Sequence, residues 1–536
     1  FRHDAVLNSH FVKGKEIEGR NYENYYDYSQ PLRRVSSHQL LAIRRGEKEG
    51  FLKVGIAIND DRAIDNICRI VVKGSGKASM LVEEVAEDSF KRLVKPSIET
   101  EFAALSKSKA DDEAIDMFAQ NARQLLFAPP LGHKRILAVD PGFRTGCKVV
   151  CLDENGNLLH HDVIYPTAPN YDIDGATEKV CALVEKYAID AISLGNGTAS
   201  RETERFLKRL RHSRKVDVYV VSENGASIYS ASKIARDEFP DKDVTVRGAV
   251  SIGRRLLDPL SELVKIDPKS IGVGQYQHDV DQNKLKEALT FTVESCVNSV
   301  GVDLNTASAP LLTYVSGLNA SVAKNVVAYR EQNGAFTARE QIKKVKGVGE
   351  KAYVQCAGFL RIPGGENILD NTAVHPESYE ACKKLLDFYG MTEEDIRNKK
   401  VADKLKKVNL TEAMEKTGLG EETLKDVIVE LSKPGRDIRD ELPKPMLRSD
   451  IMDINDLKEG MILKGTVRNI TDFGAFVDIS VHQDGLVHIS EICDRYIKHP
   501  LEALKVGEVV DVKVLGVDRK KNRISLSIKQ AKGKKK

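Results

Sequence analysis

The sequence lacks any long apolar run and any large excess of charge of one sign. No stretch of about 18 apolar residues is present, which excludes a membrane-spanning helix. The net charge is only +3 over 536 residues, so contact with nucleic acid would need local basic patches rather than a global field. With 41% hydrophobic and 30% charged residues, the composition is that of a globular protein and excludes a wholly disordered chain.

The sequence also lacks a Cys-x-x-Cys pair, which argues against a zinc site. Cys147 and Cys151 lie four apart in a predicted strand, where the even spacing places both on one face. No second pair of His or Cys follows them, so we interpret both as packing residues. The eight scattered cysteines therefore predict buried free thiols in a reducing cytoplasm.

The length is too great for a single core and predicts several domains, of mixed α and α/β type with a small all-β barrel at the end. The first residue is Phe and no signal segment precedes the structured region, so we expect a fragment that lacks its natural start. The predicted units are a helical domain (1–131), an α/β domain (132–265), a hairpin-containing helical domain (266–362), a further helical domain (363–440), a linker (441–456), a barrel (457–530) and a basic tail (531–536).

The first 130 residues are predicted to be mostly helical. One apolar stripe predicts a helix with a buried face, and a second stripe ends at Pro129 and Pro130, which stop a helix. The tyrosine-rich segment NYENYYDYSQPLRR is interpreted as capping this helical core rather than as a base-stacking surface. The two stripes consist of Val82, Val85, Ala86, Phe90 and Leu93, and of Ile115, Phe118, Ala122, Leu125 and Leu126.

The next segment predicts an α/β sheet. KRILAVDPGFRTGCKVVCLDENGNLL (134–159) indicates a strand hairpin, and helix-like stretches at 177–188 and SRETERFLKRL then alternate with strand-like AIDAISLGNG and VDVYVVSEN (216–224). Strands separated by helices favour crossover connections and parallel pairing.

ILAVDPGFRTG resembles the opening strand of RNase H-like nucleases of the YqgF branch, which are related to Holliday-junction resolvases. The resemblance implies that Asp140, Glu223 and a third acid would hold two magnesium ions. Where resolvase relatives carry the third acid, this sequence has Arg247 and Gly248, in VRGAVSIGRRLLDP. An arginine there would repel a cation. Asp258 lies about three helical turns further along, too far to replace the missing acid. We therefore expect that the domain has no working catalytic or metal site and binds no cofactor. The alternative is a structure-selective nuclease, which would bind Mg²⁺. Asp-Pro-Gly is also an ordinary turn sequence.

YVSGLN (314–319) and KVKGVG (344–349), 30 residues apart, each precede a helical stretch and resemble tandem helix-hairpin-helix elements. Glycine lets a turn approach a phosphate, and the following amides can donate to it. The first copy has Asn319 in place of the last glycine, so we expect it to be the more structural one. The candidate phosphate-binding residues are Gly317, Gly347, Gly349, Lys346 and Lys351.

The last 75 or so residues contain short strand-like segments broken by glycines, which predict a small closed barrel. DFGAFV places Phe473 and Phe476 three apart, and exposed rings beside cations are what unpaired bases require. The segment resembles the S-one type OB-fold, which implies RNA-facing roles for Phe473, Phe476, His488, Asp518 and Arg523. Arg468, Lys513 and the Lys-rich tail add positive charge. We expect these rings and basic groups to lie open to solvent on one shared surface.

The order of the motifs, with VSENGASIYSAS, IGVGQYQHDV, the paired hairpins and the final barrel, resembles the Tex family of bacterial transcription accessory proteins over essentially the whole chain. The resemblance implies a cytoplasmic protein that binds nucleic acid and acts near transcription. From the barrel we expect single-stranded RNA as a ligand, with DNA as a second one, and from the absence of apolar runs we expect no membrane partner. His278 in QYQHDV is interpreted as structural. A binding scaffold that has lost catalysis is the favoured hypothesis. The nuclease, and a protein-interaction platform with incidental RNA affinity, remain alternatives.

Overall fold

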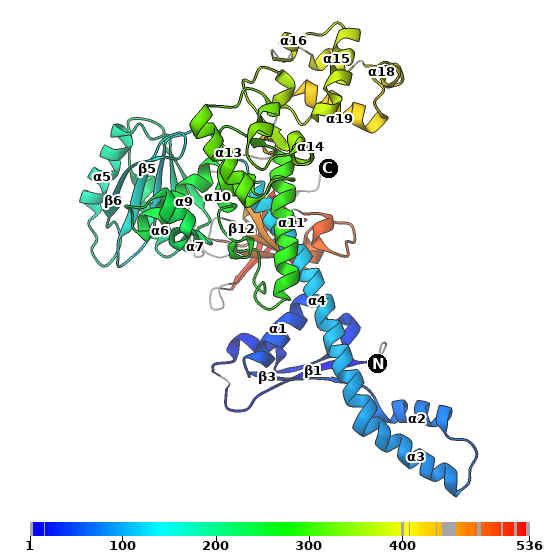
Figure 1. Ribbon diagram of the computed structural model, residues 1–536. Coiled ribbons are helices and arrows are strands. Elements are labelled where there is room, and N and C mark those ends of the chain that lie inside the picture. The colour runs from blue at the N-terminus through cyan, green and yellow to red at the C-terminus, as the bar shows by residue number, and fades with distance from the viewer. Residues whose placement is uncertain are drawn as a thin grey trace. The chain divides into compact units, whose positions relative to one another are not determined.

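The computed structural model describes residues 4–15, 17–397, 401–406, 408–435, 437–441, 457–479, 484–504, 508–518 and 523–531 (Figure 1). The predicted linker (441–456) and basic tail (531–536) lie, but for one residue each, outside the described residues. The chain divides into two compact units, and helices α4 (Lys95–Leu126) and α11 (Gln282–Val300) contribute to both. The first unit is Phe1–Asn121, Val273–Ala288 and Met452–Lys536, and the second is Ala122–Gly272 and Leu289–Ile451.

The first unit opens with a small antiparallel sheet that the sequence did not predict. Its strand order is β2-β1-β3, and helix α1 (Ser37–Lys48) begins with a capping box at Ser36. The tyrosine-rich segment contributes the edge strand β2, and Tyr22 stacks on Phe51 with ring centroids 5.8 Å apart. These aromatics therefore pack between the sheet and α1, since a Cβ on Gly46 of α1 would come within 2.9 Å of the Tyr22 ring. The strands are β1 (Val6–Phe11), β2 (Asp27–Pro31) and β3 (Leu52–Ala57).

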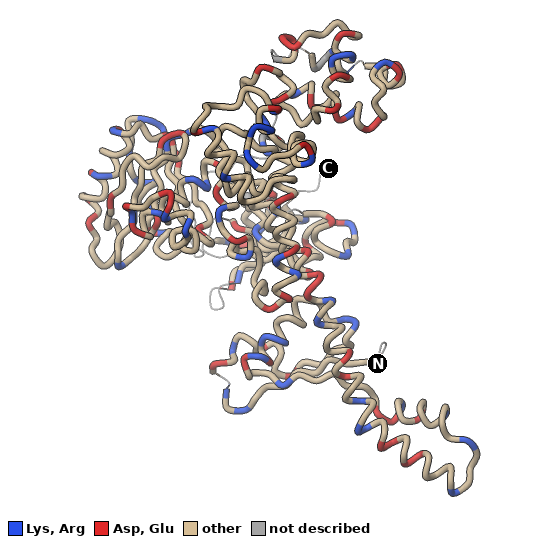
Figure 2. The backbone as a smooth tube through the Cα atoms, in the orientation of Figure 1, with Lys and Arg blue, Asp and Glu red and all other residues tan. Residues whose placement is uncertain are grey.

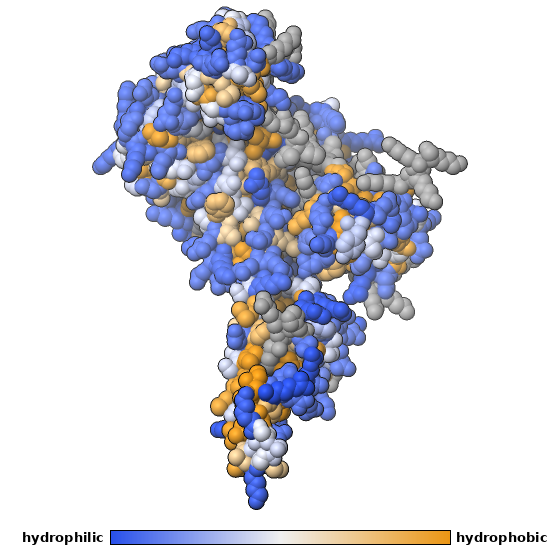
Figure 3. Space-filling view, turned by 90° about the vertical axis from the view of Figure 1, so that its right-hand side faces the viewer, coloured by the Kyte–Doolittle hydropathy of each residue, from blue (hydrophilic) through white to orange (hydrophobic). Residues whose placement is uncertain are grey.

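Helices α2 (Asp60–Val71), α3 (Lys77–Ser89) and the start of α4 carry an exposed apolar surface. The predicted buried stripe is wrong at three of its five positions, since the exposed fraction is 40% at Val82, 63% at Val85 and 58% at Leu93. Apolar residues gather on the surface of this segment (Figure 3). Helical periodicity gives the face of a helix but not what covers it. The second predicted stripe is largely buried, and α4 ends three residues before Pro129.

The second unit contains a five-stranded sheet in the order β6-β5-β4-β7-β8, the order of an RNase H-like fold. β6, β5 and β4 are antiparallel neighbours, whereas β4, β7 and β8 run parallel. Alternate residues of β4 face opposite cores: Leu137 and Val139 pack with α5 and α6, and Ile136 and Ala138 pack with α9. The elements are β4 (Ile136–Asp140), β5 (Cys147–Leu152), β6 (Leu158–Ile164), α5 (Ile173–Lys186), β7 (Ala191–Gly195), α6 (Ser200–Arg209), β8 (Asp217–Val221), α7 (Ala226–Ala231), α8 (Lys233–Glu238), α9 (Val244–Leu257) and α10 (Pro259–Leu263).

Cys147 and Cys151 are both fully buried in the core under α5 and α6. Their shared face agrees with the packing role that the even spacing predicts. The cysteines in the described part of the chain form no disulfide.

The described remainder of the second unit is helical, apart from a two-residue parallel pair of strands, β9 (Val302–Asp303) and β10 (Leu360–Arg361). Two helical groups follow one another along the chain, as the sequence predicts. The first consists of α12 (Ala309–Leu312), α13 (Ala320–Asn333), η5 (Arg339–Lys344) and α14 (Glu350–Cys356), and the second of α15 (Tyr379–Phe388), α16 (Glu393–Arg397), α17 (Ala402–Leu405), α18 (Leu410–Thr417) and α19 (Glu421–Ser432).

The final segment is a closed five-stranded barrel, which confirms the predicted OB-fold. Its interior is filled by aliphatic side chains such as Val467, Val477 and Leu526. Lysines, arginines and acids are interspersed along the whole chain, in keeping with the small net charge (Figure 2). Across the described ranges, none of the helices has the length and apolarity needed to cross a bilayer. The strands are β11 (Ile462–Thr471), β12 (Gly474–Asp478), β13 (Gly485–His488), β14 (Val509–Asp518) and β15 (Arg523–Ser527).

Candidate nucleic-acid interface

Phe476 lies on the outer face of the barrel. Its neighbours on β12, Ala475 and Val477, point into the core, so the strand alternation turns Phe476 outward. It stands opposite Asn469 of β11 and Leu486 of β13.

Phe473 lies in the turn before β12 and contacts Phe476. The two ring centroids are 6.1 Å apart and the rings are nearly perpendicular. Phe473 also lies 5.3 Å from the ring of His38, in the same unit. Both phenylalanine rings are half-buried, so the surface is less open than the sequence suggested.

The basic candidates lie on other strands of the barrel, and Lys513 stands opposite Ile462, seven residues along β11 from the partner of Phe476. His488 is exposed on β13 opposite Gly474, and Lys513 of β14 stands opposite Ser527 of β15. Arg523 is exposed at the start of β15 and pairs in register with Asp518.

Arg468 differs from the other basic candidates because a carboxylate engages it. Its Nη2 lies 2.6 Å from Asp478 Oδ2, and its Nε donates to the same oxygen at 3.0 Å. A backbone phosphate would therefore have to compete with Asp478 for this guanidinium.

Asn469 is a residue of this face that sequence reasoning missed. It stands opposite Phe476, and its Oδ1 is buried without a hydrogen-bond partner among the described residues. A buried acceptor of this kind can take a hydrogen bond from a ligand. The register shift between Val467 and Asn469 prevents its position from being found by counting along the strand.

The two hairpins have the same conformation, as the repeat predicts. Val315 and Leu318 of the first and Val345 and Val348 of the second are buried, and each helix begins two residues after the second of the pair. Gly317 and Gly347 have φ of +83° and +96°, a region that favours glycine.

The hairpins pack reciprocally against each other's helices. A Cβ on Gly317 would come within 2.7 Å of Gln355 Cβ, and one on Gly347 within 3.0 Å of Val322. Asn325, which is 30 residues before Gln355, donates from Nδ2 to the carbonyl of Lys346 at 2.8 Å. The two hairpins therefore form one paired module.

The second hairpin is the more open of the two. In the first, the Asn319 side chain accepts from the amides of Ser321 and Val322, whereas Gly349 in the second offers no side-chain cap. The exposed Lys346 and Lys351 correspond to Ser316 and Ser321 of the first copy. Without a side-chain cap and with two exposed lysines, the second copy has the features that a phosphate site needs, and its binding of phosphate stays a prediction.

In the α/β domain, Asp140 at the end of β4 and Glu223 just beyond β8 face each other. Burial first, and the charge of Glu223 second, raise the pKa of Asp140 to about 6, against the opposing effect of Lys148. Burial also raises the pKa of Glu223, although the Gly197 amide and Arg255 oppose it. Glu223 Oε2 is buried and has no hydrogen-bond partner in the described ranges.

Among the residues that the structure describes, no third carboxylate completes this pair. A Cβ on Gly248 would lie 3.6 Å from Asp140 Oδ2, so the position is suitable but the residue has no side chain. Asp258 is engaged elsewhere, at 2.7 Å from Arg439. Within the described ranges, no group of three or more His, Cys, Asp and Glu residues could hold a metal ion.

The expectation that Arg247 repels a cation at this site is wrong. Arg247 lies inside α9, is buried, and donates from Nε and Nη2 to the Phe239 carbonyl. The cation near Glu223 is instead Arg255, whose Nη1 donates to the carbonyls of Ser222 and Asn224. Side-chain direction on a buried helix depends on tertiary packing, which the sequence string does not give.

Five family models match the chain, and together they cover most of it. They describe a Tex central region (residues 1–118), a Tex protein YqgF-like domain (134–257), a helix-hairpin-helix motif (297–361), an HHH domain (367–439) and an S1 RNA binding domain (456–529).

Three curated relatives match 98% of this chain. YdcI of Bacillus subtilis is 50% identical, and 73% of its length is covered. YhgF of Escherichia coli is 46% identical with 69% covered, and protein tex of Bordetella pertussis is 44% identical with 68% covered. With a YqgF-like domain, two hairpin domains and an S1 domain in the same order, the chain belongs to the Tex family.

Proposed function

We propose that this protein is a cytoplasmic nucleic-acid-binding scaffold of the transcription machinery, and that its RNase H-like domain has lost catalysis. The barrel holds single-stranded RNA, and the second hairpin holds a phosphate backbone of RNA or DNA. The observation that carries the proposal is the outward placement of Phe476 beside Phe473, on a barrel whose outer strands also carry His488, Lys513 and Arg523.

Single-stranded RNA suits this face because each unpaired base has a flat surface that can stack on a ring. Stacking on an aromatic side chain contributes about 1–3 kcal/mol per base. His488, Lys513 and Arg523 lie on adjacent strands, where they can follow the phosphates of the same strand of RNA. A paired duplex hides its bases and would leave Phe476 without a partner.

Replacing Phe476 with Ala should weaken binding of a short single-stranded RNA about tenfold, the lower part of the stacking range, because Phe473 remains. Ile462→Ala is the matched control, since Ile462 is an apolar residue of the same barrel with 58% of its surface exposed. Fluorescence anisotropy with a labelled oligonucleotide measures both affinities. If Phe476→Ala and the wild type bind the RNA with equal affinity, the barrel does not bind RNA through this ring and the proposal is wrong on that point.

The alternative, a metal-dependent nuclease, is favoured by the buried and unpartnered Glu223 Oε2 beside Asp140. Two-metal catalysis needs more ligands than this pair supplies. Incubation with branched DNA and with RNA in Mg²⁺ or Mn²⁺ tests it, with Asp140→Asn as the control. Cleavage that Asp140→Asn abolishes would establish the nuclease and overturn the scaffold proposal.

Gly248→Asp tests why catalysis would be absent. A carboxylate built on this position would face Asp140 Oδ2 and complete a three-acid site. The variant should bind Mn²⁺ at least about tenfold more tightly than the wild type, as measured by isothermal titration calorimetry. Gly248→Asn, which adds similar bulk without charge, is the control. If Gly248→Asp and Gly248→Asn bind Mn²⁺ equally, the missing carboxylate is not the cause.

A further inference from the structure

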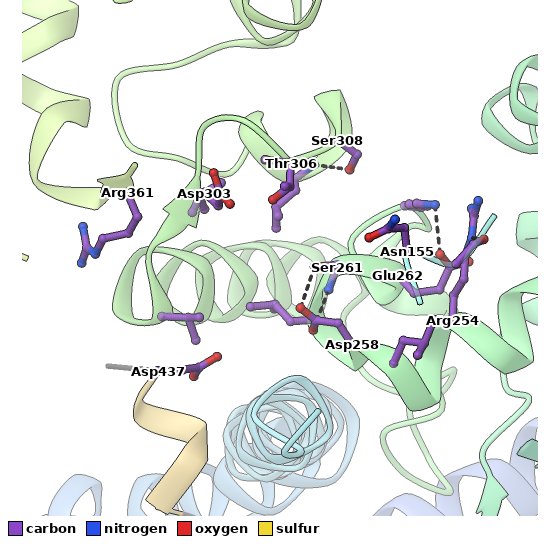
Figure 4. A pocket seen from close by; sticks show the side chains of 18 of the residues that line it. Asn155, Arg254, Asp258, Ser261, Glu262, Asp303, Thr306, Ser308, Arg361 and Asp437 are labelled. Carbon is purple, nitrogen blue, oxygen red and sulfur yellow. Dashed lines mark hydrogen bonds and ion pairs between the residues drawn. The ribbon is translucent and has the colours of Figure 1, made fainter. Parts of the chain in front are cut away.

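The second unit contains a cavity of about 840 Å³ that the proposed function does not use. The cavity is lined by the turn before β6, the ends of α8 and α9, α10, β9 and the β10 residue Arg361. Figure 4 shows Arg361 and Asp303 at one end of the pocket and Asn155 and Arg254 at the other.

Most of the acids that line the pocket already have cationic partners. Glu238 and Glu262 each lie 3.0 Å from Lys265, and Arg254 also pairs with Glu238. Asp258 and Asp437 each lie 2.7 Å from Arg439. These groups neutralise one another and leave little net charge at that part of the wall.

Arg330 and Arg361 differ from the other lining cations. Neither has a carboxylate within 4.0 Å among the described residues. Each is held by main-chain carbonyls through Nη1 alone: Arg330 donates to Leu304 and Ala307, and Arg361 to Gly358 and Leu360. Their Nε and Nη2 groups make no hydrogen bond to any described residue.

Both arginines contact the backbone of Leu304. The Leu304 carbonyl accepts from Arg330, and the Leu304 amide donates to the carbonyl of Arg361 at 2.9 Å. Gly301, with φ of +80°, lies directly against the Arg361 guanidinium, since a Cβ there would come 2.8 Å from Cζ. Both donors are therefore preorganised before any ligand arrives.

Burial disfavours the positive charge of both groups. It lowers the pKa of Arg330, and burial followed by the charge of Arg339 lowers the pKa of Arg361 to about 10. Glu331 and Asp303 lie near Arg330, and Glu430 lies near Arg361, and these acids oppose the effect of burial. The Oδ1 of Asp303 accepts from the Asn305 amide. The side chains that line the pocket include six lysines and arginines and five acids, which leaves a small excess of positive charge.

We propose that this pocket binds the phosphate monoester of a nucleotide through Arg330 and Arg361. Guanidinium forks match the geometry of phosphate oxygens, and a phosphate monoester supplies more negative charge than a carboxylate. The remaining volume suits a nucleoside, because ligand pockets of this kind span about 300–1,000 Å³. Glu262 offers a buried Oε1 without a hydrogen-bond partner in the described ranges, which can accept from a sugar or base N–H or O–H group.

The phosphate can belong to a free mononucleotide or to the 5′ end of a nucleic acid strand. The test compares 5′-AMP with adenosine, and a 5′-phosphorylated oligonucleotide with the same strand carrying a 5′-hydroxyl. We expect wild-type protein to prefer the phosphorylated member of at least one pair by about fivefold or more in Kd. Preference in the first pair identifies a free nucleotide, and preference in the second pair alone identifies a strand end.

Arg361→Gln and Arg330→Gln should each abolish that preference, whereas Arg211→Gln, an exposed arginine outside the pocket, should keep it. Circular dichroism and thermal unfolding check that each variant folds. If a pocket variant does not fold, thermal unfolding of the wild type tests the proposal instead. The phosphorylated member of the preferred pair must then raise the Tm, and the unphosphorylated member must not. Absence of preference in both wild-type pairs, or its persistence in both pocket variants, overturns the proposal.

Discussion

Replacing Arg339 with Met should lower the free energy of unfolding of the helical part of the second unit by about 3 kcal/mol or more. Arg339 is only 1% exposed and is among the largest fully buried side chains. Its Nε donates to Leu360 O at 2.9 Å, its Nη1 to Val374 O at 2.7 Å and to the Tyr379 hydroxyl at 2.8 Å, and its Nη2 to Thr372 O. Methionine has similar length but leaves these carbonyls buried without donors.

Hydrogen exchange, measured by mass spectrometry on peptides spanning 357–379, reports the free energy of local unfolding of this segment. A local measurement is needed because a multi-domain chain does not unfold in a single two-state transition. Arg339→Lys is the informative control, because it keeps the charge but cannot form the planar fork. We expect Lys to recover only a small part of the loss. Full recovery by Lys would show that charge matters here rather than the set of hydrogen bonds.

The position of Arg339 gives this prediction a functional consequence. The residue begins η5, which leads directly into the second hairpin, and its acceptors lie on β10 and on the segment that follows. It thereby joins the hairpin module to the next helical domain. Arg339→Met should therefore also weaken phosphate binding by Lys346 and Gly347, although neither residue is changed.

The parts of the fold that the sequence predicts are those where one local pattern determines the structure. β4 and β5 are continuous apolar runs around a glycine turn, and the 30-residue offset between the hairpins identifies their pairing. The outward position of Phe476 is expected from the resemblance to the S-one type OB-fold, and in the structure its neighbours Ala475 and Val477 point into the core.

The parts that the sequence does not predict depend on tertiary contacts. The stripe around Val85 has the period of a buried helix face, yet three of its five residues, Val82, Val85 and Leu93, are exposed. Arg247 stands at the right place in the string to disturb a metal site, but its guanidinium turns toward Phe239. The role of Arg255 beside Glu223 has no sequence signal at all, because the two residues lie on different elements.

Replacing Asp140 with Asn should stabilise the α/β domain at neutral pH, by up to about 3 kcal/mol. The pKa of Asp140 rises from 3.8 to about 6 on folding, and each unit corresponds to about 1.4 kcal/mol. The sign follows from proton uptake: between these two values the folded state holds the proton and the unfolded state does not. The Asp140 contribution is therefore most favourable below about pH 4 and is lost as the pH rises through about 6.

Thermal unfolding of the wild type and Asp140→Asn at pH 8 and pH 4.5, with hydrogen exchange in β4 as the local readout, measures this difference. Asn should raise the stability of β4 at pH 8 and give a much smaller gain at pH 4.5. Asp162→Asn is the matched control, because Asp162 of β6 has a lowered pKa and its replacement should destabilise the same sheet at pH 8. A gain for Asp140→Asn that is equal at both pH values would mean that a buried charge is not its source.

The expected gain bears on how the domain is used. A carboxylate that costs stability at neutral pH, beside a second buried carboxylate and a glycine where a third could stand, is the arrangement of a metal site with one ligand missing. If Asp140→Asn is more stable and still binds RNA as the wild type does, the acid pair is dispensable for holding nucleic acid. Binding would then depend on the barrel and the hairpins, which lie on other elements of the chain.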